Sequence, residues 1–122
     1  MRGDTVHLEM SYMASIVTLR EREARTAAAR MAATDRIIVA LQVYARQNGG
    51  RFIVFSSAAR REMRHDSDID ILIDFPVEMI SAAKNFAEDL CIAAHLPADI
   101  FPITTRSAAF LDRVMPDALI LS

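Results

Sequence analysis

The chain has 122 residues, and its 14 Lys and Arg against 16 Asp and Glu give a formal net charge of −2. This balance argues against nucleic-acid binding by bulk charge, which needs a positively charged surface. With 52% hydrophobic and 25% charged residues, three Gly and four Pro, the composition excludes disordered, collagen-like and disulfide-rich proteins and is typical of one globular domain.

The single cysteine, Cys91, cannot form an intrachain disulfide, and we expect it to be an inert buried thiol. No run of about 18 uninterrupted apolar residues is present. The N-terminus carries Arg2, Asp4 and Glu9 where a signal peptide would need an apolar stretch. We therefore expect a cytoplasmic protein that neither spans a membrane nor is secreted.

The first part of the sequence predicts two helices. Residues 9–33 are rich in Ala, Leu, Met, Glu and Arg and contain no Gly or Pro, which favours one long helix. Thr34 then has the character of a helix N-cap, and Gly49-Gly50 ends a second amphipathic helix. We expect 1–33 to be a helical extension and 34–122 the main domain. The extension either covers an edge of that domain or serves as an arm for a partner or a second copy.

Strands and helices alternate along the rest of the chain. Apolar runs at 51–55 and 68–75 predict buried strands, and in the second the Ile residues share one face and the Asp residues the other. Apolar residues near a period of 3.6 predict a helix at 77–95, followed by a short strand at 98–103 and a last helix at 107–115. This order predicts an α/β (α+β) fold, a mixed sheet of about three to four strands with helices packed on it.

Two carboxylates mark the second strand. In a strand, Asp68 and Asp70 lie on one face about 6.6 Å apart along the chain, close enough to converge on one divalent cation. Carboxylate oxygens together with substrate phosphates are the ligands that Mg²⁺ prefers. Asp99, on the strand at 98–103, supplies a third carboxylate if that strand lies beside the one that carries Asp68 and Asp70. The alternative is a solvated pair on an edge strand, but the neighbouring residues are apolar, and like charges on a buried strand repel unless a cation is present.

The segment 56–63 opens a short helix directly after the first strand. The first backbone N–H groups of a helix are unpaired and its positive end faces outward, so this end favours phosphate. Ser56 and Ser57 lie at this start, and Arg60, about one turn on, adds a cation that reaches the same anion. The alternative interpretation is an ordinary cap and a surface arginine.

Taken together, the residues from Phe55 to Phe75 resemble the minimal nucleotidyltransferases of the polymerase-β superfamily. Their signature is Gly-Ser, ten residues, then Asp-x-Asp on a strand, with a third Asp on a later strand. Here Ser57, ten intervening residues, Asp68 and Asp70 match that spacing, and Asp99 stands where the third acid belongs. The resemblance extends from about residue 35 to the end of the sequence.

The resemblance implies a small polymerase-β-like nucleotidyltransferase fold and Mg²⁺-dependent transfer of a nucleotide, AMP from ATP, to a hydroxyl group. Asp68 and Asp70 would hold Mg²⁺ bound to the triphosphate, and Asp99 would complete the metal site and help to deprotonate the hydroxyl. The residues implied to bind the phosphates are Ser56, Ser57 and Arg60.

The resemblance also implies a partner. Only 23 residues follow Asp99, too few for an acceptor-binding domain, so we expect the acceptor to come from another molecule. Members of this size are similar to the antitoxins of two-gene modules, in which a helical HEPN ribonuclease toxin is held inactive and modified on a tyrosine by AMP transfer. A transferase that modifies aminoglycosides is a more distant alternative.

Three positions depart from the family pattern. Ser56 stands in place of Gly, Ala58 in place of an Arg that many members carry, and Arg61 in place of a common Gly. A Cβ at position 56 crowds the approach of backbone to phosphate and restricts φ. The sequence therefore leaves two functions open: an active nucleotidyltransferase, or a weak or inactive module of the same fold that neutralises a toxin by occlusion.

Overall fold

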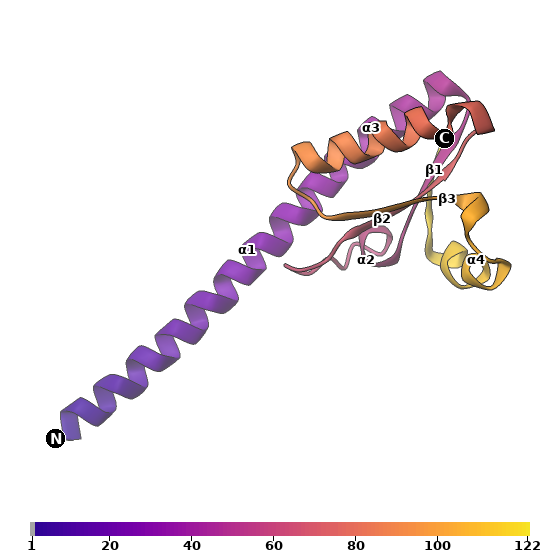
Figure 1. Ribbon diagram of the computed structural model, residues 1–122. Coiled ribbons are helices and arrows are strands. Elements are labelled where there is room, and N and C mark those ends of the chain that lie inside the picture. The colour runs from indigo at the N-terminus through magenta and orange to yellow at the C-terminus, as the bar shows by residue number, and fades with distance from the viewer. Residues whose placement is uncertain (1) are drawn as a thin grey trace.

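The computed structural model describes the chain from Arg2 to Ser122, with side chains from Met13 onward. Four strands form one mixed sheet in the order β3-β2-β1-β4 (Figure 1). β1 runs antiparallel to both β2 and β4, whereas β2 and β3 are parallel. The elements in chain order are α1 (Arg2–Asn48), β1 (Arg51–Phe55), α2 (Ser56–Ala59), β2 (Ile69–Asp74), η1 (Val77–Met79), α3 (Ile80–Ala93), β3 (Ala98–Pro102), η2 (Ile103–Thr105), α4 (Ala108–Val114), η3 (Met115–Asp117) and β4 (Leu119–Leu121).

The N-terminal segment is one helix of 47 residues, α1. The predicted boundary between two helices at Thr34 is therefore wrong. Thr34 is fully buried within α1, and its hydroxyl donates a hydrogen bond to Sδ of Met63 at 3.0 Å. A partner on the domain satisfies this hydroxyl, so it has no need to cap a helix. The expected division into 1–33 and 34–122 falls inside this continuous helix.

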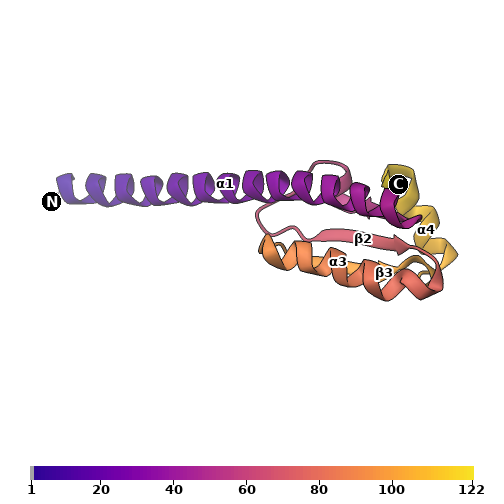
Figure 2. The same ribbon diagram turned by 90° about the horizontal axis from the view of Figure 1, so that it is seen from above.

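The N-terminal half of α1 projects beyond the sheet (Figures 1 and 2). Met13, Val17 and Leu19 are 59%, 49% and 55% exposed there. Contacts with the loop before β2 include Glu23, which lies 3.9 Å from Nδ1 of His65, and Arg30, which donates a hydrogen bond to the Ser67 carbonyl. Within Arg2–Ser122, no helix has both the length and the hydrophobicity that a bilayer-spanning segment needs.

One face of the sheet packs against α1 and α3. Leu41 of α1, Phe52 of β1 and Ile71 of β2 are completely buried in this core. At the end near Gly50, an aromatic group closes the core: the rings of Tyr44 and Phe86 stack with centroids 4.3 Å apart, while Phe52 and Phe75 pack with centroids 5.0 Å apart. The predicted alternation of β2 is confirmed, because Ile69, Ile71 and Ile73 all belong to this face.

The opposite face of the sheet packs against α4. Ile53, Phe55 and Leu72 form its buried centre, and the ring of Phe55 meets that of Phe110 edge-on with centroids 5.6 Å apart. Oγ of Ser107 caps α4 by accepting a hydrogen bond from the Phe110 N–H at 3.1 Å. The two faces thus have separate apolar cores, and the residues of β2 that point toward α4 are those that alternate with the isoleucines.

The predicted mixed α/β fold with a small sheet is confirmed. The strands expected at 51–55, 68–75 and 98–103 correspond to β1, β2 and β3, and the last helix corresponds to α4. The helix expected at 77–95 begins with a 3₁₀ turn and ends at Ala93. β4 was not predicted, because three residues give no periodic signal; its pairing with β1 makes it a strand.

Gly49 and Gly50, which join α1 to β1, predict two different stability effects. A Cβ at Gly50 would overlap the ring of Phe75, so Gly50→Ala forces that ring out of the aromatic group and should cost about 2 kcal/mol or more. Gly49 has φ +70° and no atom within 4 Å of its Cβ position, so Gly49→Ala should cost about 1 kcal/mol through backbone strain alone. Urea unfolding of both variants measures the difference, and equal losses would contradict the packing argument.

Candidate functional site

Asp70 and Asp99 lie beside each other on neighbouring strands. The parallel pairing of β2 with β3 makes them register partners. This confirms the expectation that the strand carrying Asp99 lies next to the strand carrying Asp70. Both belong to the sheet face that packs against α4, because they alternate with Ile71 and Ile100 of the other face. Asp70 is partly buried, whereas Asp99 is exposed, as is Asp68, which directly precedes β2.

The carboxyl group of Asp70 is perturbed by its surroundings. Burial, together with the charges of Asp99 and Asp68, raises the pKa of Asp70 from its ordinary 3.8 to about 6, although a hydrogen bond from Ser56 opposes this rise. The three carboxylates that the sequence singled out therefore act on one another electrostatically. Ionised Asp70 is stabilised less than an exposed aspartate, so this site favours a proton or a cation.

Ser56 turns the chain sharply at the end of β1. Its φ is +61°, in the left-handed region, so the chain leaves the strand at the residue that follows Phe55, the register partner of Asp70. This turn places the Ser56 hydroxyl against the Asp70 carboxyl, to which it donates a hydrogen bond. Arg61, after α2, is also left-handed with φ +57°, and its guanidinium forms a two-point ion pair with Asp35 of α1. One strained residue therefore begins α2, and a second lies two residues after its end.

The other two predicted phosphate-binding residues lie in and after α2. Ser57 is partly buried, and its carbonyl accepts a hydrogen bond from the Glu62 N–H at 2.8 Å. Arg60 is exposed, with Nε 3.2 Å from Oε2 of Glu62. Ala58, the position where the resembled family often has Arg, is 1% exposed and packs in the core. Position 58 thus serves packing in this chain.

A cavity of about 210 Å³ is lined by Ser56, the hydrogen-bond partner of Asp70, together with Arg60, Arg113, Val114 and Asp117. Sequence reasoning missed Arg113. It lies on α4, far along the chain from α2, and no local spacing connects the two segments. Only the packing of α4 on the sheet brings Arg113 to the residues of the motif.

The carboxylate oxygens at this site are of the kind that Mg²⁺ prefers. Among the residues with described side chains, no three His, Cys, Asp or Glu form a preassembled metal group. Mg²⁺ needs only one or two carboxylates when water and substrate phosphates supply the remaining ligands. Asp70 and Asp99 offer oxygens on one face, and a cation would offset both the burial and the neighbouring charges that raise the pKa of Asp70.

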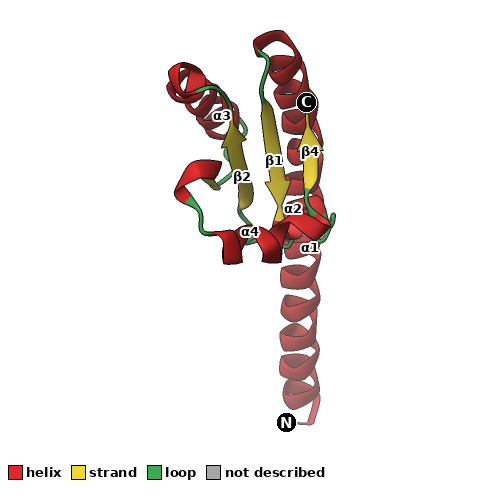
Figure 3. Ribbon diagram, turned by 90° about the vertical axis from the view of Figure 1, so that its right-hand side faces the viewer, coloured by secondary structure: helices red, strands yellow, loops and turns green. Residues whose placement is uncertain are grey.

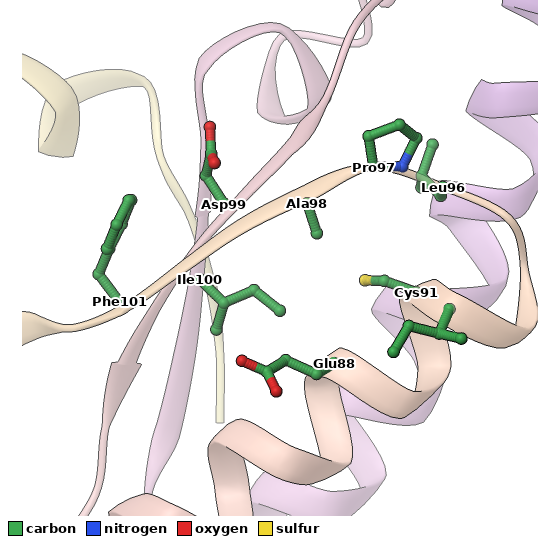
Figure 4. A pocket seen from close by; sticks show the side chains of 9 residues that line it. Glu88, Cys91, Leu96, Pro97, Ala98, Asp99, Ile100 and Phe101 are labelled. Carbon is green, nitrogen blue, oxygen red and sulfur yellow. The ribbon is translucent and has the colours of Figure 1, made fainter.

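A second cavity, of about 450 Å³, lies between α3 and β3 (Figure 4). Its walls include Cys91, Leu96 and Ile100, and burial raises the pKa of the Cys91 thiol to about 11, consistent with the expected inert thiol. In Figure 4 the Asp99 carboxyl points to the side of β3 away from Cys91. Asp99 is nevertheless among the residues that line this cavity, so the cavity reaches β3 at the position of one of the three acids.

Comparison with known protein families and with curated proteins finds no match to this chain.

The substitution Asp70→Asn tests whether burial and the neighbouring carboxylates destabilise the ionised form of Asp70. Because folding raises the pKa of Asp70 to about 6, the folded state binds its proton more tightly than the unfolded state, and stability falls as pH rises from about 4 to 6. Asn carries no charge, so the variant should be about 1–2 kcal/mol more stable than wild type at pH 8 and nearly equal at pH 4, allowing for the partial exposure of the group. Urea unfolding in metal-free buffer with a chelator measures this. Asp112→Asn, an exposed acid on α4, is the control and should change little at either pH.

Ser56→Gly tests the strained turn. Glycine adopts φ +61° without strain, but the change removes the hydrogen bond to Asp70. At pH 4.5, where Asp70 is protonated and the lost bond is weak, the variant should be about 1 kcal/mol more stable; at pH 8 the two effects should nearly cancel. The pKa of Asp70 should rise above 6 at the same time. Ser57→Gly, within α2, is the control and should lower the free energy of unfolding by about 0.5–1 kcal/mol at both pH values. If Ser56→Gly lowered it in the same way, the inference that Ser56 has a strained backbone would be wrong.

Proposed function

We propose that the protein is a Mg²⁺-dependent nucleotidyltransferase that transfers AMP from ATP to a hydroxyl of a partner protein. The observation that carries the proposal is the juxtaposition of Asp70 and Asp99, in register on one sheet face, with the Ser56 turn hydrogen-bonded to Asp70. This is the arrangement that the resemblance to minimal nucleotidyltransferases implies for the signature serine turn and three acids.

The backbone around α2 gives independent support. The two positions at which the resembled family has Gly, 56 and 61, are both left-handed here, although they carry Ser and Arg. A left-handed conformation favours glycine and is disfavoured by any Cβ. The loop therefore has the backbone shape that a glycine-containing signature would need, and this shape was not part of the sequence match.

In the proposed reaction, the acceptor hydroxyl oxygen attacks the α-phosphorus of ATP, and a bond forms between them. Asp99 takes up the hydroxyl proton, the bond from the α-phosphorus to the bridging oxygen breaks, and pyrophosphate leaves. Asp68, Asp70 and Asp99 would hold Mg²⁺, which supplies charge neutralisation at the phosphate oxygens when bound. The residues that would bind the departing phosphates are Ser56, Ser57 and Arg60.

A second candidate function rests on α1. The N-terminal half of α1 projects beyond the sheet (Figure 2), and Met13, Val17 and Leu19 in this half have exposed apolar side chains. Met13 and Val17, four residues apart, share one face of the helix, whereas Leu19 lies on the opposite side. Exposed apolar side chains on a projecting helix favour contact with another protein or with a second copy. We therefore keep the alternative of a binding module that neutralises a partner, such as a HEPN-type toxin, by occlusion. The same arm also fits the first function, because an enzyme that modifies a protein must hold it.

Thermal unfolding with ATP and MgCl₂ separates the two functions. A ligand at about 100 times its Kd stabilises the folded state by about 2.7 kcal/mol, which raises Tm by roughly 8 °C for a domain of this size. We expect such a shift for wild type, dependent on Mg²⁺, and its loss in Asp70→Asn. Asp66→Asn, an exposed acid of the preceding loop paired with Arg64, is the matched control and should keep the shift.

The outcomes of this measurement are distinct. A shift that survives in Asp70→Asn would contradict the assignment of the metal site. No shift in wild type would reject the nucleotidyltransferase and leave the binding module. With the shift established, transfer of label from [α-³²P]ATP to a protein acceptor tests the reaction itself.

A further inference from the structure

Two arginines from different elements line the cavity that Ser56 also lines. Arg60 directly follows α2, and Arg113 lies in the last turn of α4. Figure 3 shows α2 and α4 at the end of the sheet where β1 finishes. The cavity between them, of about 210 Å³, is completed by Ser56, Val114 and Asp117. Two cations and one carboxylate therefore line this space.

Ser56 connects the cavity to the carboxylate site. Its hydroxyl donates to Asp70, and the same residue lines the cavity. A ligand that reaches from Asp70 past Ser56 thus enters the space between Arg60 and Arg113. This path suits an extended anion that carries charge over several atoms, such as a polyphosphate chain.

The guanidinium of Arg113 is placed to receive such an anion. Its carbon lies 5.6 Å from the centroid of the Phe110 ring, and that ring is itself fixed against Phe55 in the core. A cation held over an aromatic ring keeps its N–H donors available for a phosphate. The volume, about 210 Å³, is below the roughly 300–1,000 Å³ of pockets that enclose a whole ligand, so only part of a nucleotide fits inside.

We propose that Arg113 is a phosphate-binding residue that, together with Arg60 and Ser56, holds the terminal phosphates of a nucleoside triphosphate. The identity of the ligand rests on the proposed function, whereas the anion site rests on the cavity. Ala58 is buried and carries no charge, so α4 supplies from the facing wall the second cation that the resembled family often carries at that position.

Calorimetric binding of inorganic tripolyphosphate without Mg²⁺ to the full chain tests the anion site. Arg113→Ala should weaken binding about tenfold, and Arg113→Lys should restore part of it. Asp117→Asn should tighten binding about threefold, because it removes a negative charge from the cavity wall. Arg36→Ala, an exposed arginine of α1 with the same change in charge, is the control and should bind as wild type does.

Binding by Arg113→Ala equal to that of Arg36→Ala, or no binding of tripolyphosphate by wild type, would overturn the inference. Opposite effects of Arg113→Ala and Asp117→Asn support it, because damage to the fold would weaken binding in both. Failure of the anion site and failure of the proposed function give different results. Tripolyphosphate binding lost in Arg113→Ala, without Asp70-dependent stabilisation by ATP and Mg²⁺, supports the anion site and rejects nucleotidyl transfer. If ATP and Mg²⁺ stabilise the protein in an Asp70-dependent way and Arg113→Ala retains this stabilisation in full, the proposed function is supported and the role of Arg113 is rejected.

Discussion

The parallel pairing of β2 with β3 is the constraint on which the candidate site depends. It places Asp70 and Asp99 at the same level on one face of the sheet, where their charges repel. The other face of β2 is fixed by Ile69, Ile71 and Ile73, all within 1% of complete burial. A shift of one residue would exchange these side chains with the acids, so the apolar core determines where the carboxylates lie. Packing on one side of β2 thus holds an unfavourable arrangement on the other.

The strain is concentrated in a short part of the molecule. Ser56 has a left-handed backbone, Asp70 is ionised with difficulty, and both lie where β1 ends and β2 begins. Either feature costs on the order of 1 kcal/mol or more, and the surrounding core must offset it. Local strain of this kind gathers at sites where a ligand can relieve it. In the proposed function, that ligand is a cation with a bound triphosphate.

The sequence alone predicted the part of this site that lies on β2. Apolar and acidic side chains alternate along this strand, and burial of one face makes that pattern visible in a short stretch of sequence. The position of Asp99 beside Asp70 needed only a short parallel strand next to β2, which the βαβ order favours. Other features depend on contacts between distant segments. Thr34 has the character of a cap in sequence, but Met63 supplies its hydrogen-bond partner and the helix continues. Arg113 enters the site because α4 packs on Phe55, and β4 is a strand only because β1 pairs with it.

The continuous helix α1 also sets a length scale for recognition. An α-helix rises about 1.5 Å per residue, so the ten residues from Met13 to Glu23 separate the exposed apolar turns from the His65 contact by about 15 Å. No Pro interrupts these residues, and a helix of this kind is stiff over such a distance. A molecule that contacts both the turn at Met13 and the domain at His65 must span about this distance. In the proposed function, an acceptor protein held at both places would present a surface at least this long.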